Sequence, residues 1–503
     1  METLYDRVKE NALERDALTK RQDNDVLLRN LSSYIMYETD GKTKVEGVVY
    51  RTLNRPKVIY NYIIASLNRA TEQIVVETEE TNLDTDYIKD FRRLSFAASD
   101  ARLRKQGESV LNPYFVEQSC LRGGISALCL YQEIEGKLKP EITKWDYRYT
   151  NYEKGEEGLS WASFGYGTKR KKADIENSKW WVKRMKGVQL PDKIAQVLSI
   201  WDTEHNEIWL DEQKVFEQEN IFRWPDGTRY VPVVIEPVSL GSMIADEGDI
   251  KNQSESVFFL IREAVPELNR MASIILTIAV GQLKPPGKIK TVEGTTIPGD
   301  AMPGYNETFA PGSLTNANPE IINLGDANNA VLMAAEIASK SMDEGGFTLD
   351  IFSAPLASGI AIIQAKEGKD VIYLPRLENI ALAKQGIGDM ITAQVLQIGG
   401  SVEVGTLGHK RLFDTGKLKG QYDVTHKFSV RSLTEKAGLA SLAASLGTRI
   451  SEHTKMREID QLDDPDGEER LKSYEAAGRE IPLIRYAISG SDSQRSTSVK
   501  AAA

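Results

Sequence analysis

Residues 267–280 read Glu-Leu-Asn-Arg-Met-Ala-Ser-Ile-Ile-Leu-Thr-Ile-Ala-Val, and this stretch decides the fold. Leu268, Met271, Ile275 and Ile278 recur at the spacing of one helical face, which predicts a helix with an apolar stripe. The apolar run is far shorter than the roughly 20 residues that cross a bilayer. We therefore expect no membrane segment here.

A second helix is expected just before this stretch. The sequence from Asp246 to Arg262 has helical character. Pro266 should break or kink the helix, because proline lacks the N–H that continues the backbone ladder. Residues 249–282 are therefore expected to hold a helix that leads into the apolar helix.

A turn-rich block, 283–325, follows the apolar helix. Pro-Gly steps begin at Pro286, Pro298, Pro303 and Pro311. A loop of this length without secondary structure is uncommon inside a compact domain. We therefore hypothesise that the block forms short strands that pair with a neighbouring copy of the chain, which would supply the missing hydrogen-bond partners.

Two further helices are expected after this block. Residues 326–343 predict the first, and the glycines Gly345 and Gly346 should end it. A loop at 344–357 then leads into a long helix that begins near residue 358. Pro375 is expected to kink this long helix.

The two ends of the chain differ from this middle part. Residues 82–106 predict a helix capped by Asp84, and a Gly-Gly step after Arg122 should end the next one. The remaining segments are expected as follows: strands over most of 125–240, short strands again over 401–431, helices over 433–488, and a low-complexity, disordered tail at 489–503.

This order resembles the core of a tailed-bacteriophage portal protein, the head–tail connector. The piece most similar to that family is Ala354-Pro-Leu-Ala-Ser-Gly-Ile-Ala-Ile362, at the entry to the long helix. The resemblance implies an α+β, portal-like fold, and it divides the chain as follows: an α/β wing at 1–248, a helix leading into stem helix 1 at 249–282, a small β-containing clip at 283–325, stem helix 2 at 326–343, a tunnel loop at 344–357, a long kinked wing helix with returning strands at 358–432, and a helical crown at 433–488.

The same resemblance implies roles for individual residues. In the tunnel loop the two glycines would be hinges, because glycine tolerates positive φ. The alternative for this loop is a surface loop with a hydrophobic anchor. Three lysines would face the DNA, and the alternative for them is that water solvates their charges. The residues concerned are Gly345, Gly346, Phe347, Asp350, Phe352 and Pro355 in the tunnel loop, Lys340, Lys366 and Lys369 facing DNA, and Pro285, Pro286, Lys288, Lys290, Pro303 and Tyr305 for partner docking by the clip.

The function implied by the resemblance is mechanical. Such a subunit forms a homo-oligomeric ring, a dodecamer, at one vertex of the capsid. Genome DNA passes through the channel of the ring during packaging and ejection, without sequence-specific contacts. The expected partners are the terminase large subunit, the head–tail adaptor, and the major capsid and scaffolding proteins. The expected location is the virion, with assembly in the host bacterial cytoplasm.

Composition agrees with this expectation. The net charge is −10, and no basic stripe is long enough for tight nonspecific DNA binding, which requires phosphates to be neutralised by Lys and Arg. A conduit for moving DNA benefits from walls of like charge that repel it. Cys120 and Cys129 lie in apolar surroundings without metal-ligand spacing, so we expect buried free thiols and a reducing compartment. Acids stand near the N-terminus where a signal peptide has positive charge.

No enzyme, cofactor or metal is expected. The histidines, His205, His409, His426 and His453, lie far apart, whereas a zinc site requires several ligands at fixed spacing. Residues 165–172 lack the spacing of a phosphate loop and predict a hairpin end with a solvated basic tip.

Two alternatives stay open. In the first, the chain is a nucleic-acid-processing enzyme or its accessory subunit, and carboxylates scattered along the sequence would come together in a two-metal site. A nuclease assay tests this alternative. The chain would otherwise be another phage structural protein, such as a scaffold or tail component. Scaffolds tend to be elongated and helical, so the β-rich middle of this sequence argues against that choice.

Overall fold

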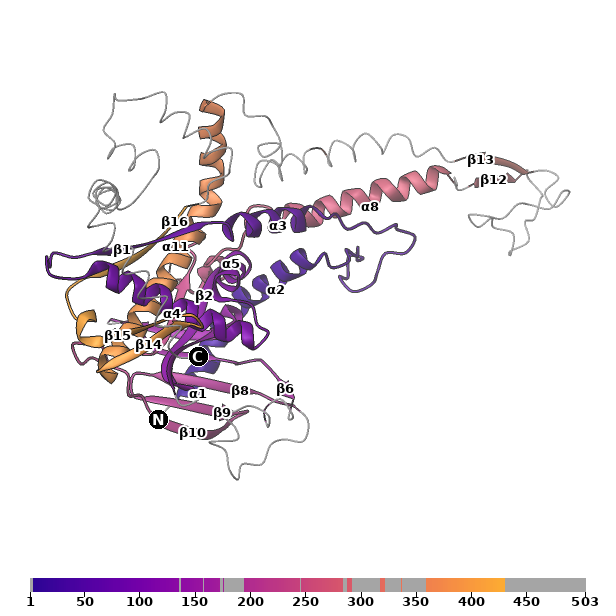
Figure 1. The fold of residues 1–503 in the computed structure, drawn as a ribbon. Helices are drawn as coiled ribbons and strands as arrows, with labels where there is room; N and C mark the ends of the chain where they lie inside the picture. The colour runs from indigo at the N-terminus through magenta and orange to yellow at the C-terminus, as the bar shows by residue number, and fades with distance from the viewer. Residues whose placement is uncertain are drawn as a thin grey trace.

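The computed structural model describes residues 3–134, 137–156, 158–171, 175, 194–244, 246–283, 287–291, 317–321, 336 and 359–429. Within these ranges helices and sheets are mixed along the chain, so the expected α+β class is confirmed. The body lies to one side, and one long helix, α8 (Ala264–Leu283), leaves it toward a small hairpin (Figure 1).

Two antiparallel sheets form the layered centre of the body. The five-stranded sheet has the order β10-β9-β8-β5-β4, and the three-stranded sheet has the order β11-β2-β3. Their strands are β2 (Gly124–Ile134), β3 (Lys137–Trp145), β4 (Thr150–Gly155), β5 (Gly158–Phe164), β8 (Val197–Asp202), β9 (His205–Leu210), β10 (Gln213–Glu219) and β11 (Val233–Pro237).

Aromatic side chains join these layers. The first helix, α1 (Leu4–Glu14), packs Val8 against Trp161 and Trp209 on one face of the five-stranded sheet. Trp145 stacks on Phe164 at a ring-centroid distance of 5.2 Å, between the two sheets. The strands expected over most of 125–240 are confirmed, and alternate residues of these strands fill the space on either side of the five-stranded sheet.

The long helix α11 (Gly359–Ile398) covers the other face of the three-stranded sheet. It continues through Pro375, so this residue does not end the helix. Its second half lies in the main core and is buried on most sides, with the polar residues Lys384 and Asp389 in ion pairs among the apolar ones, so no simple amphipathic pattern marks it. The most deeply buried residues of this half are Ile380, Ala383, Ile387, Ile391 and Val395.

Helices α2 (Asp16–Asn30), α3 (Arg55–Leu67), α4 (Thr85–Lys105) and α5 (Leu111–Leu121) surround α11 and the sheets. Asp84 caps α4 as expected, because its side chain accepts the backbone N–H of Tyr87 at 3.0 Å. Gly123 follows α5 with φ +71°, so the expected glycine stop is confirmed.

The returning strands after α11 are also confirmed. Two of them, β14 (Ser401–Thr406) and β15 (His409–Asp414), form a hairpin, and the third, β16 (Asp423–Ser429), pairs with β1 (Thr71–Glu77). No local sequence signal predicted β1, because its partner lies at the other end of the chain.

The expectation of a helix from Asp246 to Arg262 was wrong. Only a short 3-10 helix, η2 (Glu247–Asn252), is present, and turns occupy the residues from there to α8. The physical reason is tertiary: Ser254 adopts φ +53°, and the N–H of Val257 pairs with the carbonyl of Cys120 at 2.8 Å. Pro266 lies in the first turn of α8, where its missing N–H has no helical partner to lose.

The hypothesis of clip strands paired with a neighbouring copy stays a prediction, because the structure holds a single chain. Strand β12 (Gly287–Thr291) pairs with β13 (Ala317–Ile321) of the same chain, from Gly287 opposite Ile321 to Thr291 opposite Ala317. The expected elements at 344–357, 433–488 and 489–503, and all of 326–343 apart from Glu336, lie outside the described residues.

Candidate functional site

Few of the residues selected from the sequence fall in the described part of the chain. Lys288 and Lys290 are positions of β12, and Lys366 and Lys369 are positions of α11. The structure therefore places two of the docking residues on the hairpin. Those outside the described residues are Pro285, Pro286, Pro303, Tyr305, Lys340, Gly345, Gly346, Phe347, Asp350, Phe352 and Pro355.

The feature of the described residues that bears on function is an arm, which we define as α8 together with the β12–β13 hairpin. Figure 1 shows α8 running away from the body, with the hairpin at its far end. Its 20 residues give a length of ~30 Å at ~1.5 Å per residue. The arm therefore carries a two-stranded hairpin about one helix length from the sheets.

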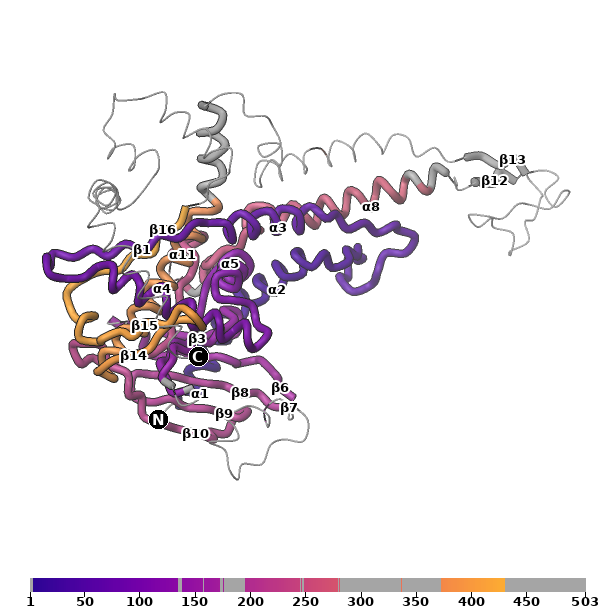
Figure 2. Tube along the Cα trace, viewed as in Figure 1, coloured from indigo at the N-terminus to yellow at the C-terminus, as the bar shows by residue number. Residues whose placement is uncertain are grey.

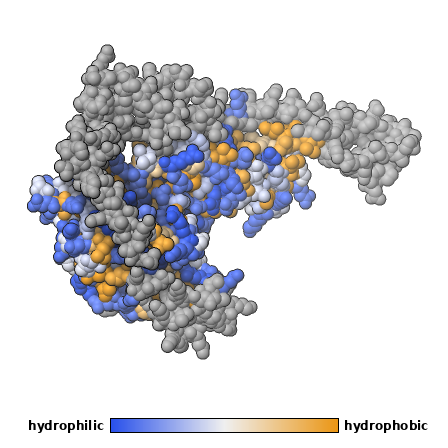
Figure 3. Space-filling model, viewed as in Figure 1, coloured by the Kyte–Doolittle hydropathy of each residue, from blue (hydrophilic) through white to orange (hydrophobic). Residues whose placement is uncertain are grey.

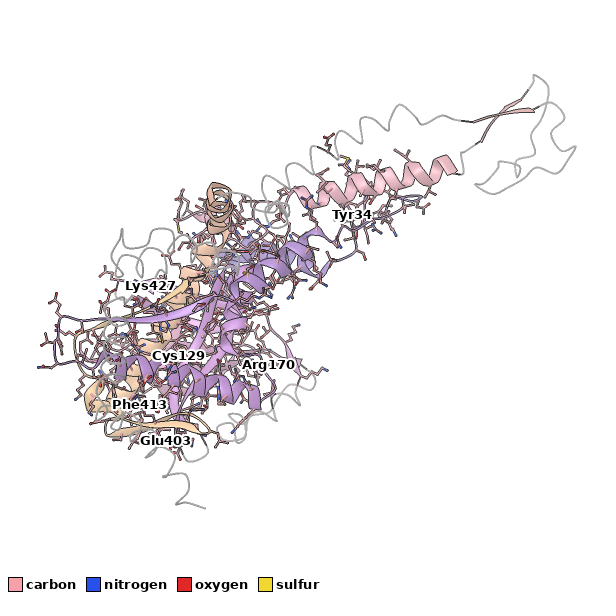
Figure 4. The ribbon with its side chains drawn as sticks, turned by 45° about the horizontal axis from the view of Figure 1, so that its top comes forward. Tyr34, Cys129, Arg170, Glu403, Phe413 and Lys427 are labelled. Carbon is pink, nitrogen blue, oxygen red and sulfur yellow. The ribbon has the colours of Figure 1, made fainter. Side chains whose placement is uncertain are left out.

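A second segment follows the arm along much of α8. Residues 31–54, between α2 and α3, run out beside α8 and return, and we call this segment the strap (Figure 2). Tyr34 of the strap lies next to α8 in Figure 4. Alternate backbone N–H groups of the strap donate to side-chain oxygens of α8: Val49 to Thr277 Oγ1 at 2.9 Å, Arg51 to Ser273 Oγ at 2.9 Å, and Leu53 to Asn269 Oδ1 at 2.8 Å.

The spacing of these bonds follows from helix and strand geometry. Four helical residues rise ~6 Å, and two extended residues rise ~6.6 Å, so every second strap N–H meets every fourth residue of α8. Ser273 and Thr277 also donate their hydroxyl protons to the carbonyls of Asn269 and Ser273, both at 2.7 Å. The sequence signal for this contact was the i,i+4 series of polar residues within an otherwise apolar helix, and sequence analysis missed it.

Apolar side chains remain exposed on the arm and the strap. Figure 3 shows hydrophobic surface along the projecting part of α8. Leu276 and Val280 of α8 are 37% and 43% exposed, and Tyr37 and Val49 of the strap are 50% and 38% exposed. Large apolar side chains on a projecting element are typical of a surface that another protein covers.

The base of the arm is held by buried charges. Arg262, which directly precedes α8, donates to both carboxylate oxygens of Asp25 at 2.8 and 3.0 Å. Asp25 is fully buried in α2. Burial opposes the charged form of Arg262, but the hydrogen bonds with Asp25 and Glu255 raise its pKa above the ordinary value. The guanidinium therefore stays charged and ties α8 to α2.

A second buried charge cluster joins β1, β16 and α11. Glu72 accepts from Lys384 Nζ at 2.6 Å and lies 2.8 Å from His426 Nδ1. Burial opposes ionisation of Glu72, but the hydrogen bonds and charges of His426 and Lys384 lower its pKa to about 2. Burial also lowers the pKa of His426, so this histidine is neutral near pH 7.

The described residues were also compared with the requirements of catalysis. Cys120 and Cys129 are fully buried, and burial raises the pKa of Cys120 to about 12, so neither thiol is poised as a nucleophile. Within the described ranges no group of three or more His, Cys, Asp or Glu is placed to hold a metal ion. In the same ranges no helix is both long and apolar enough to cross a membrane.

Surface hollows are shallow. One, of about 310 Å³, lies between the start of β3 and the outer face of β14. Its charged residues Lys410 and Glu403 form an exposed ion pair at 3.2 Å, and Glu403 lies at the periphery of the body in Figure 4.

Comparison with known proteins gave likenesses to solved structures alone. No family model matches the chain, and no curated protein matches it. Among the solved structures that resemble it are three of gene transfer agent (GTA) particles. The first is the neck of an empty GTA particle computed with C6 symmetry, at 9% identity and a TM-score of 0.41, covering 82% of this chain and 95% of that chain. The others are the virion of a native GTA particle (11%, 0.40, 82% and 95%) and the neck of a native GTA particle computed with C12 symmetry (11%, 0.41, 80% and 88%). At these identities and TM-scores the likeness carries no conclusion on function by itself.

Proposed function

We propose that this chain is a portal subunit, which forms a ring at one capsid vertex and encloses the channel for genome DNA. The observation that carries the proposal is the arm. A helix of 20 residues leaves the body, is bonded along its length by the strap, and ends in a two-stranded hairpin. An isolated hairpin of this size is marginally stable in water, so its place at the end of an arm suits docking better than folding.

Ring formation is supported by the exposed apolar residues of the arm. Leu276 and Val280 would be covered when the arms of neighbouring subunits pack side by side around an axis. Such a contact joins two different faces of identical chains, and it closes into a ring when the rotation between copies divides a full turn. We propose a dodecamer, as the resemblance of the sequence to portal proteins implies.

The proposed partners are those that the resemblance of the sequence to portal proteins implies. The tip of the arm, with the backbone positions of Lys288 and Lys290, would dock the terminase large subunit during packaging and the head–tail adaptor afterwards. The body would contact the major capsid and scaffolding proteins. The ring would assemble in the host bacterial cytoplasm and remain in the virion, and the net charge of −10 suits a channel that does not hold DNA.

In this role the chain itself catalyses no reaction, because the work of DNA movement belongs to the motor that docks on it. The test is incubation of the purified protein with linear and circular DNA in the presence of Mg²⁺ or Mn²⁺. Degradation that co-purifies with the chain would favour the nucleic-acid-processing alternative instead.

The deciding experiment is negative-stain electron microscopy of the purified protein, with mass photometry of the same sample. We expect rings with a central channel and a mass about twelve times the 56.1 kDa of one chain. A purely monomeric sample is measured again with the capsid and scaffolding proteins present. A closed dimer or tetramer without a channel would overturn the proposal.

A further inference from the structure

Residues 253–257, Gln-Ser-Glu-Ser-Val, lie between η2 and α8, and three arginines from different parts of the chain converge on them. Arg21 comes from α2, Arg262 precedes α8, and Arg376 comes from α11. All three reach Glu255, through either its carboxylate or its carbonyl.

Arg21 binds this segment by its backbone. Its Nη2 donates to the carbonyls of Gln253 and Ser254 at 2.7 and 2.8 Å, and its Nη1 donates to the carbonyl of Lys251. The same guanidinium pairs with the carboxylate of Glu255 at 3.1 Å. Only the planar, five-donor guanidinium can serve this many acceptors at once.

Arg262 closes the network from the side of the arm. It donates to Glu255 Oε2 at 2.7 Å, in addition to its two bonds with Asp25. Glu255 therefore stands between two guanidinium groups, and its side chain is only 10% exposed. Because the pairs are shielded from water, loss of the central carboxylate leaves two buried charges incompletely matched.

Arg376 links the segment to α11. It is fully buried directly after Pro375, and its Nη2 lies 3.4 Å from the carbonyl of Glu255. Its Nη1 donates to the carbonyl of Ile372 at 2.8 Å, in the turn that the proline deprives of an N–H. The guanidinium therefore bonds both to the disrupted turn of α11 and to residues 253–257.

The backbone of the segment is also constrained. Ser254 is 5% exposed and has φ +53°, a region that non-glycine residues rarely adopt. Its hydroxyl lies 3.2 Å from that of Tyr147, and a Cβ at Gly123 would lie 1.8 Å from its carbonyl oxygen. Contacts from several directions hold Ser254 in this conformation.

We propose that residues 253–257 form a joint that fixes the directions of two projecting elements, α8 and the first half of α11, relative to the body. Figure 1 shows these two helices leaving the body in different directions. Each is attached to the joint by an arginine near the point where it enters the core. A movement of one element therefore changes the position of residues to which the other is bonded. The inference concerns the chain alone and holds whatever the arm binds.

The test measures the direction of the arm in solution. Because Cys120 and Cys129 are buried, nitroxide labels at Val280→Cys on α8 and Glu212→Cys on the five-stranded sheet can be attached selectively. Double electron–electron resonance (DEER) spectroscopy gives the distribution of distances between the two labels. Glu255→Gln removes the central charge, and Glu267→Gln, whose side chain is 55% exposed in the first turn of α8, makes the same charge change as a control.

We expect Glu255→Gln to broaden this distribution about twofold or more and Glu267→Gln to leave it unchanged. Amide exchange over 264–270 and 359–371 should rise about tenfold in Glu255→Gln and stay constant in the five-stranded sheet. An unchanged distribution in a folded variant, or exchange that rises evenly over the whole chain, would overturn the joint.

A milder variant keeps the test decisive if Glu255→Gln does not fold. Arg21→Lys keeps the positive charge but replaces the guanidinium fork by a single nitrogen, which cannot reach the same set of carbonyls. The same two readouts apply. Broadening confined to the projecting helices supports the joint, and a folded variant with the parent distribution contradicts it.

Discussion

Ser273 of α8 accepts the backbone N–H of Arg51 at 2.9 Å and donates its own hydroxyl proton to the carbonyl of Asn269 at 2.7 Å. The hydroxyl is fully buried, so water cannot replace either bond. Ser273→Ala would leave the N–H of Arg51 without its acceptor. We expect a loss of about 1–2 kcal/mol in the free energy of unfolding, measured by urea denaturation.

The matched control for this prediction is Ser33→Ala, an exposed serine in the same strap. A surface substitution of this kind should change the free energy of unfolding by less than about 0.5 kcal/mol. Equal losses in the two variants would mean that the bond to Arg51 contributes nothing specific.

His426 predicts a loss of stability in mild acid. Burial lowers its pKa below the ordinary 6.5, so just below pH 6.5 the unfolded chain binds a proton at this histidine more readily than the folded chain does. The stabilising contribution is complete above pH 6.5 and declines as the pH falls from there toward the lowered pKa of the folded state. Thermal unfolding followed from about pH 7.5 to about pH 5.5 should therefore be steeper for the parent chain than for His426→Gln.

Glu72 adds a separate, more acidic window. The stabilising contribution of its carboxylate is present above the ordinary pKa of 4.5 and is lost as the pH falls toward about 2.

The control for the His426 prediction is His409→Gln, at an exposed position of β15. A control variant that flattens the slope between neutral and mildly acidic pH as much as His426→Gln would contradict the assignment to the buried ring.

Substitution of Gly388 in α11 is expected to lower the free energy of unfolding through a steric clash. A Cβ there would lie 1.9 Å from Nη1 of Arg92, which is 2% exposed and pairs with Asp389. In an open helix position, Gly→Ala gains about 0.5–1 kcal/mol. We expect Gly388→Ala to cost more than about 2 kcal/mol instead, because a buried guanidinium must move.

Gly386 provides the comparison within the same helix. Its Cβ would lie 3.2 Å from a methyl group of Val234, which a small side-chain shift relieves. Calorimetry of both alanine variants decides the matter, and a melting temperature of Gly388→Ala at or above that of Gly386→Ala would refute the close approach.

The two cysteines are expected not to react with thiol reagents in the folded chain. Cys120 and Cys129 are fully buried, and burial raises the pKa of both, that of Cys120 to about 12. A thiol reagent should therefore label neither in the folded chain within minutes at neutral pH, and both after denaturation in guanidinium. Rapid labelling of a native thiol would show that the core around α5 or β2 opens.

Local signals in the sequence were sufficient for much of the fold. Asp84 before a periodic apolar run predicted α4 and its cap, because capping depends only on residues a few positions apart. Gly123 predicted the end of α5 in the same way. The long helix was also expected, and Pro375 lies within it.

Features that depend on distant partners were not predictable. The strand β1 is defined by its pairing with β16, and residues 253–257 are held out of a helix by contacts with Arg21, Gly123 and Cys120. The residues within either segment give no sequence signal that identifies these distant partners. Propensity is a weak prior, and tertiary contacts override it in such places.

The candidate site illustrates the same division. The arm was expected from the apolar run at 267–280, and α8 confirms a helix there. The bonds that hold it were missed, although Asn269, Ser273 and Thr277 recur every four residues. Spacing alone could mark them as one face of a helix, but it could not identify the strap as the segment that bonds to them.

The pairing of β1 with β16 has a consequence for the order in which the chain folds during synthesis. Glu72 lies opposite Phe428, so β1 leaves the ribosome long before its partner strand exists. At ~5–20 residues per second the delay is roughly 20 to 70 s. During the last part of that time α8 is already made, while the body remains unfinished. Nascent chains on one messenger RNA are thereby at risk of premature association, and a chaperone that binds before residue 423 emerges would raise the yield of folded protein.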